Sequence, residues 1–399
     1  MFSYGFGNAA AYVIARTVAD SAFLSQIGPD RLPALYVVAA GVVALSSLLY
    51  GFLVRRLSLR HVIQLTLLGL AAASALVPWL MLRFPQSLTV FAGAYLLAQI
   101  RGSLGTIQFA TLFNEQFPDN PERVVGLVGA GATLAGIVVG SGIGMVSELI
   151  NLKSLMWLAA GIDLAAMLPV SALRPLPTAT PVQTHSAGTA LHRTDNPRLA
   201  DAIRLRYVLG IASVTFLSVA VATLVEYQWK VTAATELLRD EAKLARYFGL
   251  FYGGVYLATG LLQCLATGYV LRQRSVLVGL LVFPLALLSA TATALLFSAG
   301  RLLLWPMTLS KACDTLRRSM HDPSIQVLYG PLESLLRRQS IAFVAGIVKP
   351  FAEAAAAVTL LLMTTWWSLR AISWLVVILI AVWLMFDVAV FRRFSRMRR

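Results

Sequence analysis

The stretch Ala9–Ile27 reads AAAYVIARTVADSAFLSQI, an apolar run with Arg16 and Asp20 set inside it. A helix that crosses a membrane needs about 20 predominantly apolar residues, which is the length of this run. Arg16 and Asp20 are four positions apart, so a helix places both on one face, where they can pair. Charge at bilayer depth is costly, and we therefore expect the pair to face a polar cavity or a partner and not lipid.

The composition of the whole chain repeats this signal. The chain has 399 residues, of which 58% are hydrophobic and only 13% charged, with a mean hydropathy of +0.76. Soluble domains carry about 25% charged residues, so the deficit indicates a polytopic helical membrane protein. The first run is long and lacks a basic leader, which argues against a cleaved signal. Cys264 and Cys313 both lie in apolar runs and form neither a disulfide framework nor a metal motif.

Apolar windows of about 20 residues predict about twelve spans and an all-α fold of two six-helix halves. The predicted spans are 6–26, 32–54, 62–82, 88–112, 124–146, 154–173, 207–226, 246–271, 275–298, 302–320, 340–364 and 372–391. Residues 174–206 are rich in Pro, Thr, Ser and charge, which is typical of a linker. The predicted organisation is therefore an N-terminal half 1–173, a cytoplasmic linker 174–206 and a C-terminal half 207–399.

The distribution of basic residues predicts the orientation of the chain. One alternating set of connectors, together with the tail, carries 18 Lys and Arg residues, and the opposite set carries nine. Because cytoplasmic loops are enriched in Lys and Arg, both termini are expected to be cytoplasmic, in a bacterial inner membrane. The net charge of +15 then reflects topology and contact with anionic lipid, and nucleic acid is not an expected partner.

Four cations lie near the middle of predicted spans: Arg16, Arg101, Lys311 and Lys349. At ~1.5 Å per residue each is roughly 13–20 Å from its helix end, close to the midplane. Three of them have an acidic residue at helical spacing: Asp20, Asp314 and Glu353, respectively. Arg101 has no acidic residue in its own span. We therefore expect Arg101 to be the best candidate for free positive charge, and its guanidinium suits carboxylate or phosphate.

Two interpretations of these charges remain open. Each pair could be a structural ion pair that fixes helix register. Four cations at one depth in both halves instead favour a polar cavity that prefers an anion. Kinks are also expected there, because Pro306 precedes Lys311 and Pro350 directly follows Lys349. Gly136, Gly140 and Gly144 have GxxxG spacing, which predicts a helix-packing face.

The sequence contains no GxxxxGK[ST], HExxH or GxSxG motif, and it predicts neither an enzyme nor a cofactor or metal site. With no soluble ATP-hydrolysing domain, uphill transport would have to use an ion gradient, such as protons, or exchange against a counter-substrate.

Two halves of six spans joined by a basic loop resemble the major facilitator superfamily. The loop between spans two and three, Gly51-Phe-Leu-Val-Arg55-Arg56-Leu-Ser58-Leu-Arg60-His61, is similar to that superfamily's G-x-x-x-D-R-x-G-x-R-R pattern. Arg55 replaces the acid and Ser58 the glycine. The departure argues against ordinary drug/proton antiport.

A narrower resemblance rests on short segments: Ala15–Ser25, Asn114–Glu115 followed by Pro121–Gly131, Glu226–Lys230 and Leu316–Pro323. These segments resemble the ATP/ADP translocase family of nucleotide transporters and its bacterial relatives. The superfamily lines its central cavity with spans one, four, seven and ten. The resemblance implies that Arg16, Arg101, Glu226 and Lys311 lie on those spans, with Lys349 on the neighbouring eleventh.

These observations predict a secondary transporter that moves a polar, anionic small molecule by alternating access, with a nucleotide or organic phosphate implied by the resemblance. Arg16, Arg101, Lys311, Lys349 and Glu226 are the predicted substrate-binding residues. Asp20, Asp314, Glu353 and Glu115 are predicted to balance charge or carry protons. Two alternatives remain: a proton-coupled exporter of an amphipathic compound such as a siderophore, lipid precursor or drug, and a transport-inactive scaffold acting through its basic loop and tail.

Overall fold

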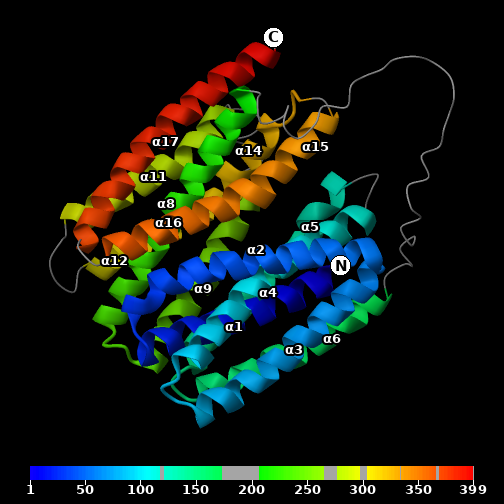
Figure 1. Ribbon diagram of the computed structural model, residues 1–399, viewed down its shortest axis with the longest axis vertical. Coiled ribbons are helices and arrows are strands. Elements are labelled where there is room, and N and C mark those ends of the chain that lie inside the picture. Colours follow the sequence, from blue (N-terminus) through cyan, green and yellow to red (C-terminus); the bar gives the residue numbers. More distant parts are fainter. Residues whose placement is uncertain are drawn as a thin grey trace. The chain divides into compact units, whose positions relative to one another are not determined.

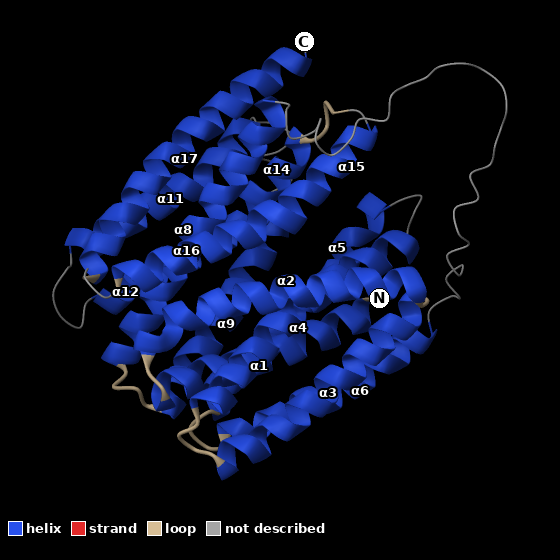
Figure 2. Ribbon diagram, in the orientation of Figure 1, coloured by secondary structure: helices blue, strands red, loops and turns tan. Residues whose placement is uncertain are grey.

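The computed structural model describes residues 1–116, 121–172, 206–264, 276–296, 303–332, 334–364 and 368–398. These residues form helices and turns without a strand (Figure 2). The predicted all-α fold is confirmed. Most of the predicted linker lies outside the described residues.

Every predicted span corresponds to helix over the residues of it that the structure describes. The helices, in order, are α1 (Phe2–Gln26), α2 (Leu32–Arg56), α3 (Leu59–Arg83), α4 (Leu88–Gln116), α5 (Pro121–Val146), α6 (Leu155–Ala172), α8 (Arg206–Glu236), α9 (Glu241–Leu262), α11 (Val276–Leu296), α12 (Leu304–Ala312), α13 (Asp314–Leu316), α14 (Asp322–Leu328), α15 (Ser334–Phe343), α16 (Lys349–Met363) and α17 (Leu369–Arg398). Short 3-10 turns at Pro29–Arg31 and Leu152–Ser154 lead into α2 and α6.

Among the described residues, 8 helical segments are long and apolar enough to cross a membrane. They lie in α2, α3, α5, α6, α8, α11, α17 and the segment Val344–Met363. Three further helices of comparable length, α1, α4 and α9, carry charged residues. Such residues lower the hydropathy of a span, and in a membrane they need protein or polar surroundings.

Contacts divide the chain into two compact units. Unit 1 comprises Met1–Arg31, Gly41–His185 and Leu237–Gly260, and unit 2 comprises Leu32–Ala40, Ser186–Glu236 and Leu261–Arg399. In unit 1, α1 packs against α4, α5 and α6, while α3 lies beside α6 (Figure 1). In unit 2, α8 packs against α12, α16 and α17, and α11 packs against α12 and α17.

The most enclosed described helix of each unit carries charge. Most side chains of α1 are buried, including Asp20, and the apolar window of α8 is 72% buried. A helix that is apolar on all sides belongs in the interior of a bundle. The interior position of α1 and α8 therefore places Asp20 and Glu226 away from lipid, as the cost of a charge in hydrocarbon requires.

Two helices are interrupted by π-helical segments. These segments are Arg317–His321, between α13 and α14, and Val344–Val348, between α15 and α16. Each ends two residues before a proline, Pro323 or Pro350. A proline ring clashes with the carbonyl four residues back, and a wider π turn relieves this clash. The sequence predicted weakened helix near Pro350, and the π turn is its observed form.

The glycines of α5 form a packing face within unit 1, as their GxxxG spacing predicted. A Cβ on Gly140 would lie 2.6 Å from the backbone nitrogen of Gly253 and 2.9 Å from the carbonyl oxygen of Gly249, both on α9. A Cβ on Gly144 would lie 2.5 Å from the Leu250 side chain. The two backbones therefore approach so closely that only glycine fits.

This contact predicts opposite effects for two neighbouring glycines. Gly140→Ala is expected to lower stability by about 1–3 kcal/mol, because the added methyl group meets backbone that cannot rotate away. Gly142→Ala is the matched control, since a Cβ there meets nothing within 4 Å. It should raise stability by roughly 0.5–1 kcal/mol through helix propensity. Thermal unfolding of the two variants in the same detergent measures both effects, and equal melting temperatures would contradict the packing.

Candidate functional site

One charged pair of unit 1, Arg16 and Asp20 of α1, contacts Tyr252 of α9. Arg16 lies 3.6 Å from Asp20 (Nε to Oδ2), which confirms the predicted pair. Arg16 also donates to two tyrosines, from Nε to the hydroxyl of Tyr252 at 2.9 Å and from Nη1 to that of Tyr12 at 2.5 Å. The Tyr252 hydroxyl in turn donates to Asp20 at 3.2 Å. Arg16 is thus held in a closed ring of polar contacts.

Aromatic rings surround this guanidinium. Its central carbon lies 5.8 Å from the centroid of each of the Tyr12 and Tyr252 rings, within cation–π range. On α9, Tyr252 also has edge-to-face contact with Phe251, which stacks with Tyr247. The Arg16 side chain is 16% exposed, whereas the Asp20 side chain is 2% exposed. The cation is therefore the accessible member of the pair, and it is presented among aromatic faces.

Arg101 does not provide free positive charge, and that expectation was wrong. Its side chain is fully buried in unit 1, where Nη1 donates to Asp163 of α6 at 2.5 Å and Nη2 donates to Ser74 of α3 at 2.6 Å. The partner lies on another helix, and sequence spacing within one span cannot reveal it. Burial of an arginine requires such a partner. The geometry is that of an ion pair joining three helices.

Unit 2 contains a longer network that alternates in sign. Lys311 Nζ lies 3.1 Å from Glu226 Oε2 and 2.6 Å from Asp314 Oδ2. The chain continues on one side from Glu226 Oε1 to Lys230 Nζ at 2.9 Å, and on the other from Asp314 Oδ1 to Arg317 Nε at 3.8 Å. These five residues come from α8 and the interrupted helix 304–328. The network as described contains three cations and two carboxylates, with Arg318 near Asp314 and Asp322 near Arg317.

Lys230 was assigned from the sequence to a connector, and this assignment was wrong. It is fully buried on α8, which continues to Glu236, and its ammonium lies 5.7 Å from the centroid of the Tyr36 ring. Hydropathy falls after residue 226 and so predicts the end of the span there, although α8 continues to Glu236. The i, i+4 spacing of Glu226 and Lys230 was the signal that could have placed Lys230 in the site.

The remaining predicted site residues are Lys349, Glu353 and Glu115. Lys349 and Glu353 are both exposed in the first turns of α16. Lys349 lies close enough to His321 and Asp322 to interact with them electrostatically. Glu115 is exposed in the last turn of α4. Lys349 and Arg317 both interact with Asp322, so Lys349 lies near one end of the unit 2 network.

A second polar cluster of unit 2 was missed by the sequence analysis. The rings of Phe283, His321 and Trp383 are mutually edge-to-face, with centroids 5.2 to 5.6 Å apart. One turn beyond Trp383 lies Asp387, which is fully buried beside the Trp383 indole. A single acid in an apolar span was the available signal, but no cation at helical spacing drew attention to it.

The loop between α8 and α9 holds a conventional helix cap. Asp240 Oδ1 accepts a hydrogen bond from the backbone N–H of Lys243 at 3.0 Å. This bond favours the carboxylate form and holds the pKa of Asp240 below its usual value. It fixes the start of α9, the helix that carries Tyr252.

Comparison with known proteins finds no matching family model and no matching curated protein. Solved structures do match over nearly the whole chain. A mutant of the nucleoside transporter NupG aligns with a TM-score of 0.67 at 11% identity, covering 100% of this chain and 98% of that one. The human organic anion transporter MFSD10 (TETRAN) aligns with a TM-score of 0.64 at 14% identity, covering 97% and 98%. A bacterial homologue of the human lysosomal transporter Spinster aligns with a TM-score of 0.60 at 12% identity, covering 99% and 98%.

These similarities define the architecture. The chain has the helical fold of the major facilitator transporters, a multi-pass membrane architecture, as its span pattern predicted. Identities of 11–14% establish the fold and not a substrate. Any functional conclusion has to come from the charged networks themselves.

Proposed function

We propose that this protein is a secondary active transporter that carries an anionic metabolite across a bacterial inner membrane by alternating access. The observation that carries the proposal is the network Lys230–Glu226–Lys311–Asp314–Arg317, which brings three cations and two carboxylates together within one apolar helical unit. Buried cations are costly unless they are paired, and a bound anion would pair with the Lys311 ammonium in place of a carboxylate. Arg16 in unit 1 is a separate cation that is partly accessible.

Two carboxylates of the network occupy the Lys311 ammonium when no substrate is bound. When no substrate is bound, Glu226 and Asp314 satisfy Lys311 on two sides. An incoming anion competes with them for the ammonium, so binding depends on a small difference between two favourable arrangements. Such a balance suits transport, because a substrate held too tightly is not released. Glu226 and Asp314 are also the groups that we propose to balance charge or carry protons.

The substrate that we propose is a nucleotide or organic phosphate, with exchange against a second anion as the coupling. The sequence resemblance to the ATP/ADP translocase family supports it. The surroundings of Arg16 also support it, because aromatic faces can stack on a base while a guanidinium binds phosphate through paired N–H groups. Among the structures of similar fold, NupG is a nucleoside transporter and MFSD10 an organic anion transporter.

One observation favours a second candidate function, the proton-coupled export of an amphipathic compound. The run of aromatic contacts on α9, from Tyr247 through Phe251 to Tyr252, would suit an apolar or aromatic cargo. Export of such a compound would make Asp20 and Glu226 proton carriers. The two candidates differ in whether the cargo must carry negative charge.

A thermal-shift series with the purified protein tests the proposal. The probes are ADP, AMP and glucose phosphate, with adenosine and glucose as neutral counterparts and a hydroxamate siderophore as an amphipathic compound. A ligand at 100 times its Kd stabilises by about 2.7 kcal/mol, which is visible as a raised melting temperature. We expect at least one phosphorylated probe to stabilise and its neutral counterpart not to. Stabilisation by the siderophore or the neutral compounds alone would refute the anion proposal.

A further inference from the structure

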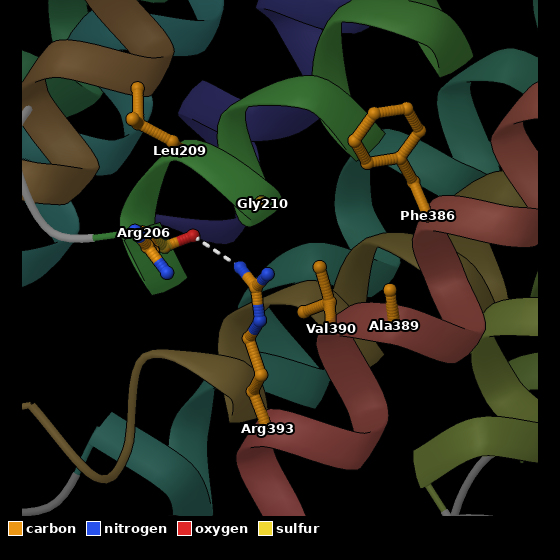
Figure 3. Close-up of a pocket in the computed structure, with 7 residues that line it drawn as sticks. All are labelled: Arg206, Leu209, Gly210, Phe386, Ala389, Val390 and Arg393. Carbon is orange, nitrogen blue, oxygen red and sulfur yellow. Dashed lines mark hydrogen bonds between the residues drawn. The ribbon is translucent and has the colours of Figure 1, made fainter.

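A shallow pocket lies between α8 and α17 of unit 2, remote in sequence from the charged network of the proposed function (Figure 3). Its volume is about 240 Å³. Two arginines mark one end, Arg206 at the start of α8 and Arg393 near the end of α17. The remaining lining is apolar: Leu209, Gly210, Phe386, Ala389 and Val390. The pocket therefore has a cationic end and an apolar floor.

The pocket depends on a close approach of the two helices. A Cβ on Gly210 would lie 2.7 Å from Val390 Cγ2, so glycine lets α17 pack tightly at this level. One turn further along α17, Arg393 Nη1 donates to the backbone carbonyl of Arg206 at 2.8 Å, as Figure 3 shows. This bond fixes the guanidinium at the rim and, within the described part of the chain, uses one of its five N–H groups. The other donors can bind a second acceptor.

The positions of Arg206 and Arg393 along the chain indicate how deep in the membrane the pocket lies. Arg206 begins one apolar span and Arg393 lies near the end of another. Arginines at span ends lie at the level of lipid headgroups, while Phe386 and Leu209, both exposed, lie on the apolar side. A molecule that fits must therefore carry negative charge at one end and hydrocarbon at the other. A soluble phosphate would leave the apolar floor unused.

We propose that this pocket binds one anionic phospholipid, with the headgroup phosphate between Arg206 and Arg393 and an acyl chain along Ala389, Phe386 and Leu209. Charge complementarity with two arginines selects an anionic over a zwitterionic headgroup. The bound lipid joins the start of α8 to the end of α17. Because α8 carries Glu226 and Lys230, occupancy stabilises the helix on which the buried network is built.

The test uses the full-length protein in detergent and measures lipid binding by native mass spectrometry. The probes are dioleoyl phosphatidylglycerol and dioleoyl phosphatidylcholine, with glycerol phosphate as the soluble headgroup analogue. We expect one phosphatidylglycerol to bind in preference to phosphatidylcholine and glycerol phosphate not to displace it. Arg206→Gln with Arg393→Gln should weaken phosphatidylglycerol binding roughly thirty-fold, at about 1 kcal/mol for each arginine.

Arg392→Gln combined with Arg370→Gln is the matched control, because it removes two exposed arginines of α17 that do not line the pocket. It should leave binding within about twofold, since the direct contacts with phosphate remain. Ala389→Phe fills the floor and keeps both arginines, so it should weaken phosphatidylglycerol without affecting the folded yield. Equal losses in the control and the pocket variant, or equal binding of the two lipids, would overturn the proposal. Displacement by glycerol phosphate would instead assign the arginines to a soluble anion and also overturn it.

Discussion

Replacing Arg101 with Ala is expected to destabilise the protein by about 3–5 kcal/mol and to reduce its folded yield sharply. Asp163 would remain as a buried carboxylate without its cation, since it and Arg101 are 1% and 0% exposed. Ser74 would lose its donor as well. The measurement is the yield of monodisperse protein after detergent extraction, together with its melting temperature.

The companion variant distinguishes a structural pair from a binding residue. Arg101→Met combined with Asp163→Leu removes both charges, and replacing a buried pair with apolar groups of similar size is often neutral or stabilising. We expect this double variant to recover the melting temperature lost in Arg101→Ala. Two results together would contradict this account: normal folding of Arg101→Ala, and loss of all transport in a folded double variant. Arg101 would then be assigned to the substrate site.

Replacing Lys311 with Ala is expected to abolish uptake while the protein still folds. Each carboxylate of the network keeps a cation in this variant, because Glu226 retains Lys230 and Asp314 retains Arg317. The ammonium that would pair with an incoming anion is removed, and the attraction for that anion is lost with it. Loss of hydrogen bonds to a charged group, at about 1.5–3 kcal/mol, corresponds to roughly a 10- to 100-fold loss of affinity.

Two controls sharpen this expectation. Lys311→Arg keeps the charge and should retain measurable uptake with a changed affinity for substrate. Lys243→Ala removes an exposed lysine near the start of α9 that pairs with Asp240 at 3.6 Å, and it should leave uptake unchanged. Wild-type uptake by Lys311→Ala, at normal yield, would show that the unit 2 network does not bind the substrate.

The contrast between Arg101 and Lys311 shows what the sequence could and could not predict. Spacing within a helix is periodic, so the pairs Arg16–Asp20 and Lys311–Asp314 were predictable and are present. A partner on another helix depends on how each helix is rotated and where it crosses its neighbour. Asp163 lies 62 positions from Arg101, and no local pattern connects them.

The fold itself was largely predictable, because hydropathy decides which segments cross a membrane. The residues at which a helix ends were less predictable. The apolar window ended near Glu226, but α8 continues to Glu236 and buries Lys230 against Tyr36. Packing, and not hydropathy, decides where a helix ends. The π turn before Pro350 is a similar case: the proline predicted a weakened helix, whereas the form of the distortion depends on the surrounding contacts.

The most direct test of the proposed function is counterflow in proteoliposomes loaded with unlabelled ADP. We expect labelled ADP to accumulate inside vesicles that contain the wild-type protein, and external AMP but not adenosine to compete. Arg16→Gln should weaken this uptake and Lys311→Gln should abolish it, both at normal reconstitution. Uptake that adenosine inhibits as well as AMP, or that persists in Lys311→Gln, would contradict an anion site that includes Lys311.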